Sequence, residues 1–536
     1  MVNSLLFIFL FMAKYPIGKQ DFKSLREERY VYVDKTRFIP KLIEEGSYYF
    51  LGRPRRFGKS LFLSTLEYFF KGERNLFKGL AVERYEWDWN EFPVIHIDLN
   101  GIDYTIEGNL GIKLNQLLDD YEKQFKITLE EKDPAIRFAK LISKAHDVAG
   151  AQVVVLVDEY DKPVIDNIDN PELREKNRDT LRGFYSVLKS SDRFLKLVFM
   201  TGVTKFGQMN VFSGLNNIRD ISLRTTFDTV CGLSEEEIRE NFEEGIEKLA
   251  QAENTDFEGA MKLLKDNYDG YHFSEDCPDL YNPFSLINAL ADSTIDPYWY
   301  ATGTPKFLAD MLLKQNYDLE TLNNVTVSRD RLLNINNSFD DPVSLLYQTG
   351  YLTIKEYDKE IREYTLGYPN LEVEKAFFNY LIPNYSRSSN KDIDSQIDEF
   401  KRDINRGEAH KAMEALEAFT AGISYDMIPS PETERHFQML FHMFVKLVVS
   451  KDVKSIPEYK TSDGRIDLLI ETPRFVYIFE IKKNGNAKEA LKQIEEKGYY
   501  LQFTSTSKKI FLIGLNFSTT KKRIDRFDIK TYPSNR

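Results

Sequence analysis

Four short, almost wholly apolar segments, separated by long stretches with a helical pattern, dominate the first 230 residues of this chain. They lie at 47–51, 94–99, 153–157 and 196–200. Strands this apolar are typical of a parallel sheet that helices cover on both faces, since half-exposed strands alternate apolar and polar residues. Residues 14–230 are therefore predicted to form an α/β domain.

The first of these segments leads into Gly58-Lys59-Ser60 and then into a predicted helix. Such a strand–loop–helix can wrap backbone N–H groups around nucleotide phosphates at a helix N-terminus. Lys59 suits the β- and γ-phosphates, and the Ser60 hydroxyl suits Mg²⁺. The spacing departs from G-x-x-x-x-G-K-S/T, because Gly52 is one residue early and Arg53 takes the first glycine position. By itself, the match also fits a basic strand–helix turn.

A second half of a nucleotide site follows the third and fourth apolar segments. Asp158 and Glu159 end the third segment, where Asp158 can hold Mg²⁺ through water and Glu159 can orient or deprotonate the attacking water. Thr201 ends the fourth segment and is a candidate sensor of the γ-phosphate. Together with the Gly-Lys-Ser motif, these residues predict ATP binding and hydrolysis.

Three arginines, Arg53, Arg55 and Arg56, surround the loop. Phosphate contacts and simple surface charge are both open for them. We favour phosphate, because three guanidinium groups beside Lys59 would otherwise repel one another at short range.

A carboxylate pattern marks the C-terminal end. Asp467 begins one predicted strand, and Glu480 and Lys482 end the next, after a turn at 472–474. Residues i and i+2 of a strand share a face, so Glu480 and Lys482 should point together, with Asp467 on the neighbouring strand. Two converging carboxylates can hold Mg²⁺, which would activate water against a phosphodiester while Lys482 stabilises the developing charge. Taken alone, the pattern also fits a structural ion pair.

Three further residues are candidates around this pattern. Glu434 is expected as an additional metal ligand, and Glu458 competes with it for that role. Gln493, in the helix predicted after Lys482, is expected to face the same site.

Several stretches resemble the bacterial AAA-ATPase-like proteins, which join a predicted P-loop ATPase to a C-terminal domain of the PD-(D/E)XK nuclease superfamily. The stretches that carry the resemblance are 16–18, 32–36, 53–60, 158–163, 201–203, 212–217, 268–271 and 281–284. An arginine in place of the first P-loop glycine is a trait of that family, and Arg53 matches it. The resemblance implies ATP binding, and the residues of both patterns indicate Mg²⁺ as a second cofactor. It also begins at the equivalent of Met12, which favours Met12 over Met1 as the start.

The expected fold is therefore a multidomain α/β chain. It consists of an N-terminal extension (1–13), a P-loop ATPase domain with a parallel sheet (14–230), a helical lid (231–330), a winged-helix-like segment (331–386) and a PD-(D/E)XK nuclease-like domain (387–536). The motifs at 268–271 and 281–284 suggest packing of the lid rather than chemistry.

Charge divides unevenly between the parts. The chain has 72 Lys+Arg and 84 Asp+Glu, a net charge of −12. Residues 451–536 hold 18 of the basic and 11 of the acidic residues, a local charge of +7 that leaves −19 for the rest. The C-terminal domain is thus basic enough to face nucleic acid. Two cysteines cannot form a disulfide framework, which favours the cytoplasm, and no apolar stretch is long enough to cross a membrane.

These observations predict an ATPase coupled to a metal-dependent nuclease that acts on DNA or RNA. The alternative is an ATP-dependent switch whose nuclease-like domain binds nucleic acid or a protein without cleaving. The sequence leaves the oligomeric state, including a homo-oligomer, open.

Overall fold

The computed structural model describes most of the chain as two compact units. The described residues are 14–205, 217–299, 308, 311–312, 315, 317, 319–333, 341–385, 390–422, 433–449, 453–461 and 464–532. One unit comprises residues up to 317 with 321–373, and the other comprises 318–320 with 374–536. The boundary falls within helix α16 (Leu371–Tyr385), so one helix belongs to both.

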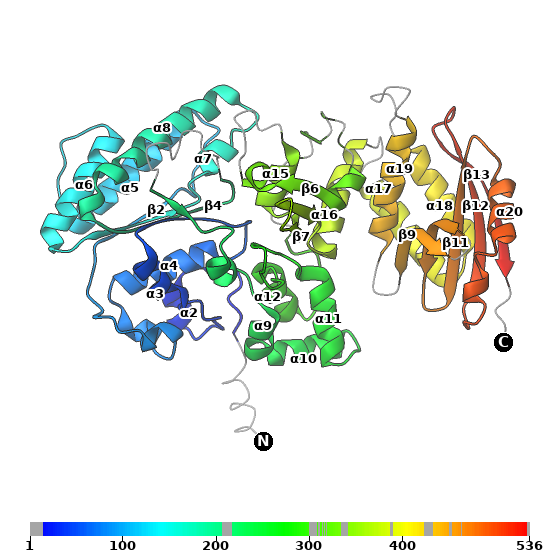
Figure 1. The fold of residues 1–536 in the computed structure, drawn as a ribbon, viewed down its shortest axis with the longest axis horizontal. Coiled ribbons are helices and arrows are strands. Elements are labelled where there is room, and N and C mark those ends of the chain that lie inside the picture. Colours follow the sequence, from blue (N-terminus) through cyan, green and yellow to red (C-terminus); the bar gives the residue numbers. More distant parts are fainter. Residues whose placement is uncertain are drawn as a thin grey trace, which may run out of the picture. The chain divides into compact units, whose positions relative to one another are not determined.

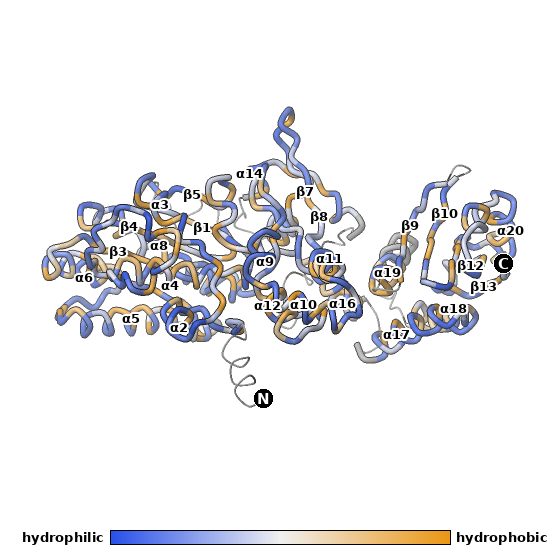
Figure 2. Tube along the Cα trace, turned by 90° about the horizontal axis from the view of Figure 1, so that it is seen from below, coloured by the Kyte–Doolittle hydropathy of each residue, from blue (hydrophilic) through white to orange (hydrophobic). Residues whose placement is uncertain are grey.

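A parallel five-stranded sheet forms the centre of the first unit, which confirms the predicted α/β class. Its order is β2-β3-β4-β1-β5, with β1 (Tyr48–Gly52), β2 (Val94–Asp98), β3 (Val153–Asp158), β4 (Leu195–Gly202) and β5 (Arg219–Asp220). All six residues of β3 are buried, and the sheet strands carry mainly apolar residues (Figure 2). That composition is possible because helices cover both faces (Figure 1).

Two helices of this domain precede β1, and the others lie between successive strands. They are α2 (Phe22–Glu27), α3 (Phe38–Glu45), α4 (Lys59–Phe70), α5 (Asn109–Phe125), α6 (Pro134–Ala149), α7 (Lys162–Ile165) and α8 (Pro171–Ser190). In Figure 1, α5, α6 and α8 lie on one side of the sheet, and α2, α3 and α4 lie on the other.

The helices that follow, which we refer to as the lid, are α9 (Glu235–Asn241), α10 (Glu243–Ala252), α11 (Phe257–Tyr268) and α12 (Pro283–Asp292). The start of α9 is the predicted one, because Ser234 caps the helix and forms a capping box with Glu237. The lid has its own apolar core, against which Val31 and Val33 of the N-terminal segment pack.

The middle of the chain contains the predicted helix and hairpin. These are α15 (Pro342–Thr349), β7 (Thr353–Asp358) and β8 (Glu363–Gly367). A third strand, β6 (Val325–Ser328), pairs with β8 and precedes the short α14 (Arg329–Leu333). The β6 strand falls in a stretch that was expected to be helical; its alternating valines pack better on a sheet. Every residue of α15 is buried.

The second unit is a mixed five-stranded sheet with helices. Its order is β13-β12-β11-β10-β9, and only β11 and β12 run parallel. The strands are β9 (Lys454–Thr461), β10 (Gly464–Glu471), β11 (Phe475–Lys483), β12 (Lys509–Ser518) and β13 (Arg523–Tyr532), and the helices are α17 (Asn390–Arg406), α18 (Ala409–Ala421), α19 (Thr433–Val448) and α20 (Ala487–Lys497). The edge strands β9 and β13 were not expected, because both are rich in charged residues.

Two expectations fall outside the described residues: the N-terminal extension at 1–13, and most of the motif at 212–217. Within the described part of the chain, no helix combines the length and apolar character that crossing a membrane requires.

Candidate functional site

The loop between β1 and α4 carries the Gly-Lys-Ser motif. Gly58 adopts a left-handed conformation (φ 95°) immediately before α4, and Lys59 is the first residue of that helix. The buried Lys59 ammonium donates to the carbonyl oxygens of Arg53 (3.1 Å) and Pro54 (3.2 Å) and lies 3.5 Å from the Glu159 carboxylate. The lysine thus lies across the loop, next to the acid expected to act on water.

Asp158 lies at the centre of this site. The carboxyl ends of β3, β4 and β1 meet at one edge of the sheet, as in other parallel sheets with ligand sites. Ser60 Oγ donates to one oxygen of Asp158 (2.5 Å), and Thr201 Oγ1 donates to the other (2.6 Å). Burial, followed by repulsion from Glu159, raises the pKa of Asp158. Glu159 itself has a left-handed backbone (φ 50°), uncommon for a non-glycine residue.

The three arginines of the loop have different surroundings. Arg53 is 1% exposed, and its guanidinium donates to the carbonyl oxygens of Gly52, Ser222, Phe227 and Asp228. It also lies over the Phe273 ring. Arg56 is exposed, has φ 70°, and lies over the Phe284 ring of the lid. Arg55 is half-buried and has no hydrogen-bond or ion-pair partner among the described residues.

An apolar cavity adjoins the loop, with an empty volume of about 570 Å³. Its walls come from the N-terminal segment, the loop, α4 and the lid, and they include Val31, Val33, Gly58, Leu61, Leu233 and Ile287. This apolar lining suits the apolar part of a small organic ligand. The sequence analysis missed these residues as a site; the motif at 32–36 was the available signal, because it had no assigned role.

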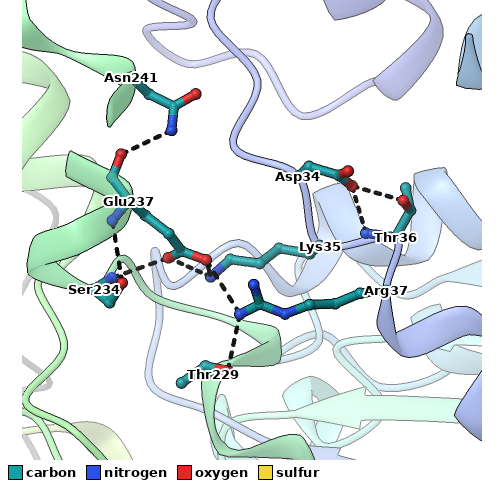
Figure 3. Close-up of polar contacts among 8 residues, drawn as sticks. All are labelled: Asp34, Lys35, Thr36, Arg37, Thr229, Ser234, Glu237 and Asn241. Atoms are coloured by element: carbon teal, nitrogen blue, oxygen red, sulfur yellow. Dashed lines mark hydrogen bonds and ion pairs between the residues drawn. The ribbon is translucent and has the colours of Figure 1, made fainter. Parts of the chain in front are cut away.

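Lys35, which lines this cavity, forms a buried ion pair with Glu237 (Figure 3). Lys35 donates to both oxygens of Glu237 (2.7 Å each), and Arg37 reaches the same carboxylate (3.3 Å) and Thr229. Glu237 is also the capping-box residue of α9. Burial lowers the pKa of Lys35. We call Lys35, Arg37 and Glu237 the lid clasp, because they join the N-terminal segment to the first lid helix.

In the second unit, the structure brings the predicted carboxylates together. Leu468 and Phe479 are paired across β10 and β11, and Asp467 and Glu480 are the next residues along each strand. Asp467 accepts from the Ile481 N–H (2.7 Å). Lys482 lies 3.3 Å from Glu480, so these two side chains share a face.

Gln493 of α20 completes this group. Lys482 donates to the Gln493 amide oxygen (2.5 Å), and the Gln493 amide nitrogen donates to Glu480 Oε1. The other oxygen of Glu480, Oε2, is buried without a hydrogen-bond partner. Burial, with repulsion from Asp467, raises the pKa of Glu480 to about 7. A buried carboxylate oxygen without a donor suits a hard cation such as Mg²⁺.

The structure describes the two further candidate acids, Glu458 and Glu434, to different extents. Glu458, at φ 53° in β9, forms an ion pair with Arg465, and its charge adds to the raised pKa of Glu480. Glu434 falls in α19, but its side chain lies outside the described residues. Among the side chains that are described, no group of three or more His, Cys, Asp or Glu is arranged to hold a metal ion.

Comparison with known proteins supports the predicted families of the N-terminal and the C-terminal domain. Residues 16–212 match the model of a "Predicted AAA-ATPase" family, and residues 432–527 match the PD-(D/E)XK nuclease superfamily. A protein of Azotobacter chroococcum mcd 1, described as an "uncharacterized protein in vnfD 5'region", is 35% identical over 528 residues, covering 97% of this chain and 99% of that relative. The chain therefore belongs to the AAA-ATPase-like family, with a C-terminal domain of the PD-(D/E)XK nuclease superfamily.

Proposed function

We propose that the first unit binds and hydrolyses ATP and that the second unit is a metal-dependent nuclease acting on DNA or RNA under the control of the nucleotide. The observation that supports this most is Asp158, held between the hydroxyls of Ser60 and Thr201 with Lys59 and Glu159 beside it. Magnesium sites of P-loop NTPases use a serine and an acid in this relation.

Each residue of the first site has a task in this proposal. The adenine lies in the apolar cavity, while Gly58 N–H, Lys59, Arg55 and Arg56 contact phosphate oxygens. Ser60 and Asp158 would hold Mg²⁺, which would offset the negative charge of the phosphates. Glu159 accepts the proton of the attacking water, and Thr201 keeps Asp158 in place. Arg53 braces the loop through its four carbonyl contacts.

At the second site, Asp467, Glu480 and Glu434 are the proposed ligands of Mg²⁺, which would activate water against a phosphodiester. Gln493 and Lys482 keep Glu480 oriented through the contacts described above. Lys482 also offers its positive charge to the phosphate as negative charge develops there. The basic character of residues 451–536 supports a nucleic-acid substrate.

The two free, buried cysteines support a cytoplasmic location.

A second candidate is a nucleotide switch whose C-terminal domain binds nucleic acid or protein without cutting. It is favoured because, among the described side chains, no group of three or more His, Cys, Asp or Glu is arranged to hold a metal ion. It predicts ATP-dependent binding without cleavage.

The test compares full-length protein with Lys59→Ala and Asp467→Ala. Each is incubated with Mg²⁺ and labelled single- and double-stranded DNA and RNA, with and without ATP. We expect phosphate release to be lost in Lys59→Ala and strand cleavage to be lost in Asp467→Ala. Cleavage that persists unchanged in both variants would contradict the proposal, and ATP-dependent retention of intact nucleic acid would favour the switch.

A further inference from the structure

The turn that follows β4 is bound tightly by the loop that carries the catalytic acids. Asp161 Oδ2 accepts from the N–H groups of Val203 (3.0 Å) and Thr204 (2.6 Å) and from the Thr204 hydroxyl (2.7 Å). The Tyr160 hydroxyl donates to the Thr204 carbonyl (2.9 Å). Residues 160 and 161 directly follow Glu159, so the position of this turn and the position of Glu159 are linked.

Gly202, the last residue of β4, lies in close contact with both loops. Its carbonyl accepts from the Arg53 N–H (3.2 Å). A Cβ at Gly202 would lie 2.5 Å from an Asp161 oxygen and 2.6 Å from the Tyr160 ring. The turn is therefore packed between the P-loop and the acidic loop.

The third neighbour of the turn comes from the middle of the chain. The Lys205 N–H donates to the side-chain oxygen of Gln348 in α15 (2.6 Å), across 143 residues of sequence. The amide of Gln348 is itself oriented, since its nitrogen donates to the Leu332 carbonyl (3.1 Å). Gln348 is 7% exposed, and burying an amide is favourable only when its bonds are satisfied.

The end of α15 also touches the P-loop. Gly350 caps this helix with a left-handed backbone (φ 91°), and a Cβ there would lie 2.7 Å from the Pro54 ring. The carbonyl of Pro54 is one of the two that accept from Lys59. The buried helix α15 thus contacts both the phosphate-binding loop and the turn after β4.

We propose that Gln348 is a positioning residue for ATP hydrolysis: its amide fixes the turn after β4, and with it Asp161 and Glu159, and through this contact α15 responds to the nucleotide. The inference rests on the proposed ATPase function. It assigns to the middle segment a role in the nucleotide site that neither family match covers, since the ATPase model ends at residue 212 and the nuclease model begins at 432.

The test uses two substitutions at this position. Gln348→Met keeps the shape but removes the acceptor, so we expect kcat for ATP hydrolysis to fall about tenfold or more while KM stays within threefold, because the acids are misplaced but the phosphates are still bound. Gln348→Glu keeps an acceptor for the Lys205 N–H and, in its protonated form, a donor for the Leu332 carbonyl, so we expect it to retain more of kcat than Gln348→Met, and most at low pH. Ser344→Ala is the matched control, because Ser344 lies on the same helix and, among the described residues, its hydroxyl bonds to Arg331 and Asp341.

Trp299 gives a second readout that does not depend on turnover. Its ring packs edge-on against Tyr351, the residue after Gly350, at a centroid distance of 4.9 Å. With Trp87→Phe and Trp89→Phe as background, Trp299 is the only tryptophan left. We expect Mg²⁺–ATP to change its emission when Gln348 is present and to leave it unchanged in Gln348→Met.

Three outcomes distinguish a failure of the proposed ATPase function from a failure of the proposed role of Gln348. If the unmodified protein neither binds a fluorescent ATP analogue nor releases phosphate, the proposed function fails. If it does both and Gln348→Met is equally active, or Gln348→Glu retains no more activity than Gln348→Met even at low pH, only the role of Gln348 is overturned. If Gln348→Met does not fold, hydrogen exchange in the unmodified protein decides: ATP must change protection of both 202–205 and α15, and a change in one alone contradicts the inference.

Discussion

Asp158 and Glu480 are both buried acids on internal strands of their sheets, and both have a second carboxylate next to them that raises the pKa. Their surroundings differ in one respect. Both oxygens of Asp158 accept hydrogen bonds from hydroxyl groups, and Lys59 is close by. Glu480 has one oxygen on Gln493 and Lys482 and one with no donor.

This difference indicates what each site requires from its ligand. The nucleotide site is closed on itself, so binding must exchange existing contacts of Lys59 and Ser60 for contacts with phosphate and metal. The nuclease-like site has a buried carboxylate oxygen without a hydrogen-bond donor, so a cation can bind this oxygen without displacing a protein donor. The first arrangement suits a switch between two states, and the second suits a site that fills when metal is present.

The largest effect is expected at Glu159. Glu159→Gln should lower kcat for ATP hydrolysis by about 10²- to 10⁴-fold, because a general base is lost while the geometry is kept. Binding of a fluorescent ATP analogue should stay within threefold. Asp166→Asn, an acid in the same loop that pairs with Lys162, is the control and should hydrolyse normally. Residual activity above a tenth would exclude Glu159 as the base.

The lid clasp gives the next effect. Glu237→Ala should lower the free energy of unfolding of the first unit by about 3–5 kcal/mol, since it leaves the buried Lys35 without its partner. All three tryptophans lie in the first unit, so urea unfolding followed by tryptophan fluorescence reports on it. Glu235→Ala, on the same helix but half-exposed, should cost less than about 1 kcal/mol. Equal losses in the two variants would show that the buried lid clasp contributes no more to stability than a half-exposed ion pair.

The third effect is expected for metal binding at Glu480, in the second unit. Without nucleotide, Glu480→Gln should weaken Mn²⁺ binding by about 10- to 100-fold, because the oxygen without a donor is removed. Electron paramagnetic resonance of free Mn²⁺ measures this directly. Glu471→Gln removes an acid of β10 that pairs with Lys508, and it should bind Mn²⁺ normally. Unchanged binding in Glu480→Gln would place the metal elsewhere.

The pH dependence has a defined sign. Folding raises the pKa of Glu480 from 4.5 to about 7, so the ionised form is disfavoured in the folded unit. Without metal, the stability of the second unit should therefore fall by about 1–3 kcal/mol as the pH rises from 5 to 8. Burial also raises the pKa of Asp467, which acts in the same direction.

Hydrogen exchange in β11 and α20 measures this locally. A local probe is needed because burial also raises the pKa of Asp161 to about 6 and of Glu372 to about 7 in the first unit. Glu480→Gln should flatten the profile, and excess Mg²⁺ should restore stability at pH 8. A profile that rises with pH would contradict the assignment.

The smallest effect is expected at Arg55. Arg55→Ala should raise KM for ATP about threefold to tenfold with kcat unchanged, because a half-exposed charge contributes modestly to phosphate binding. Steady-state phosphate release measures it, with Arg84→Ala as an exposed control. An unchanged KM would leave Arg55 as surface charge.

Patterns within a few residues were sufficient for much of the architecture. The apolar segments predicted β1 to β4 and their parallel sheet, and the serine and glutamates at 234–237 predicted the start of α9. Spacing within β11 predicted that Glu480 and Lys482 share a face. The charged strands β9 and β13 were missed, because edge strands need no apolar pattern.

The direction of individual side chains was beyond these patterns. Sequence placed Arg53 beside the phosphate loop, but only the fold shows its guanidinium among four carbonyl oxygens. The apolar cavity is assembled from segments more than 200 residues apart, so no local motif could describe it.

The amino-acid sequence by itself determined the fold class, the family and the residue types of both sites, since strand burial, helix caps and short motifs are written in neighbouring positions. Tertiary structure alone decided which oxygen of Glu480 lacks a donor, how the lid is clasped, and that Gln348 binds the turn after β4. The physical reason is that these contacts join distant segments, and their geometry depends on packing, which local sequence does not encode.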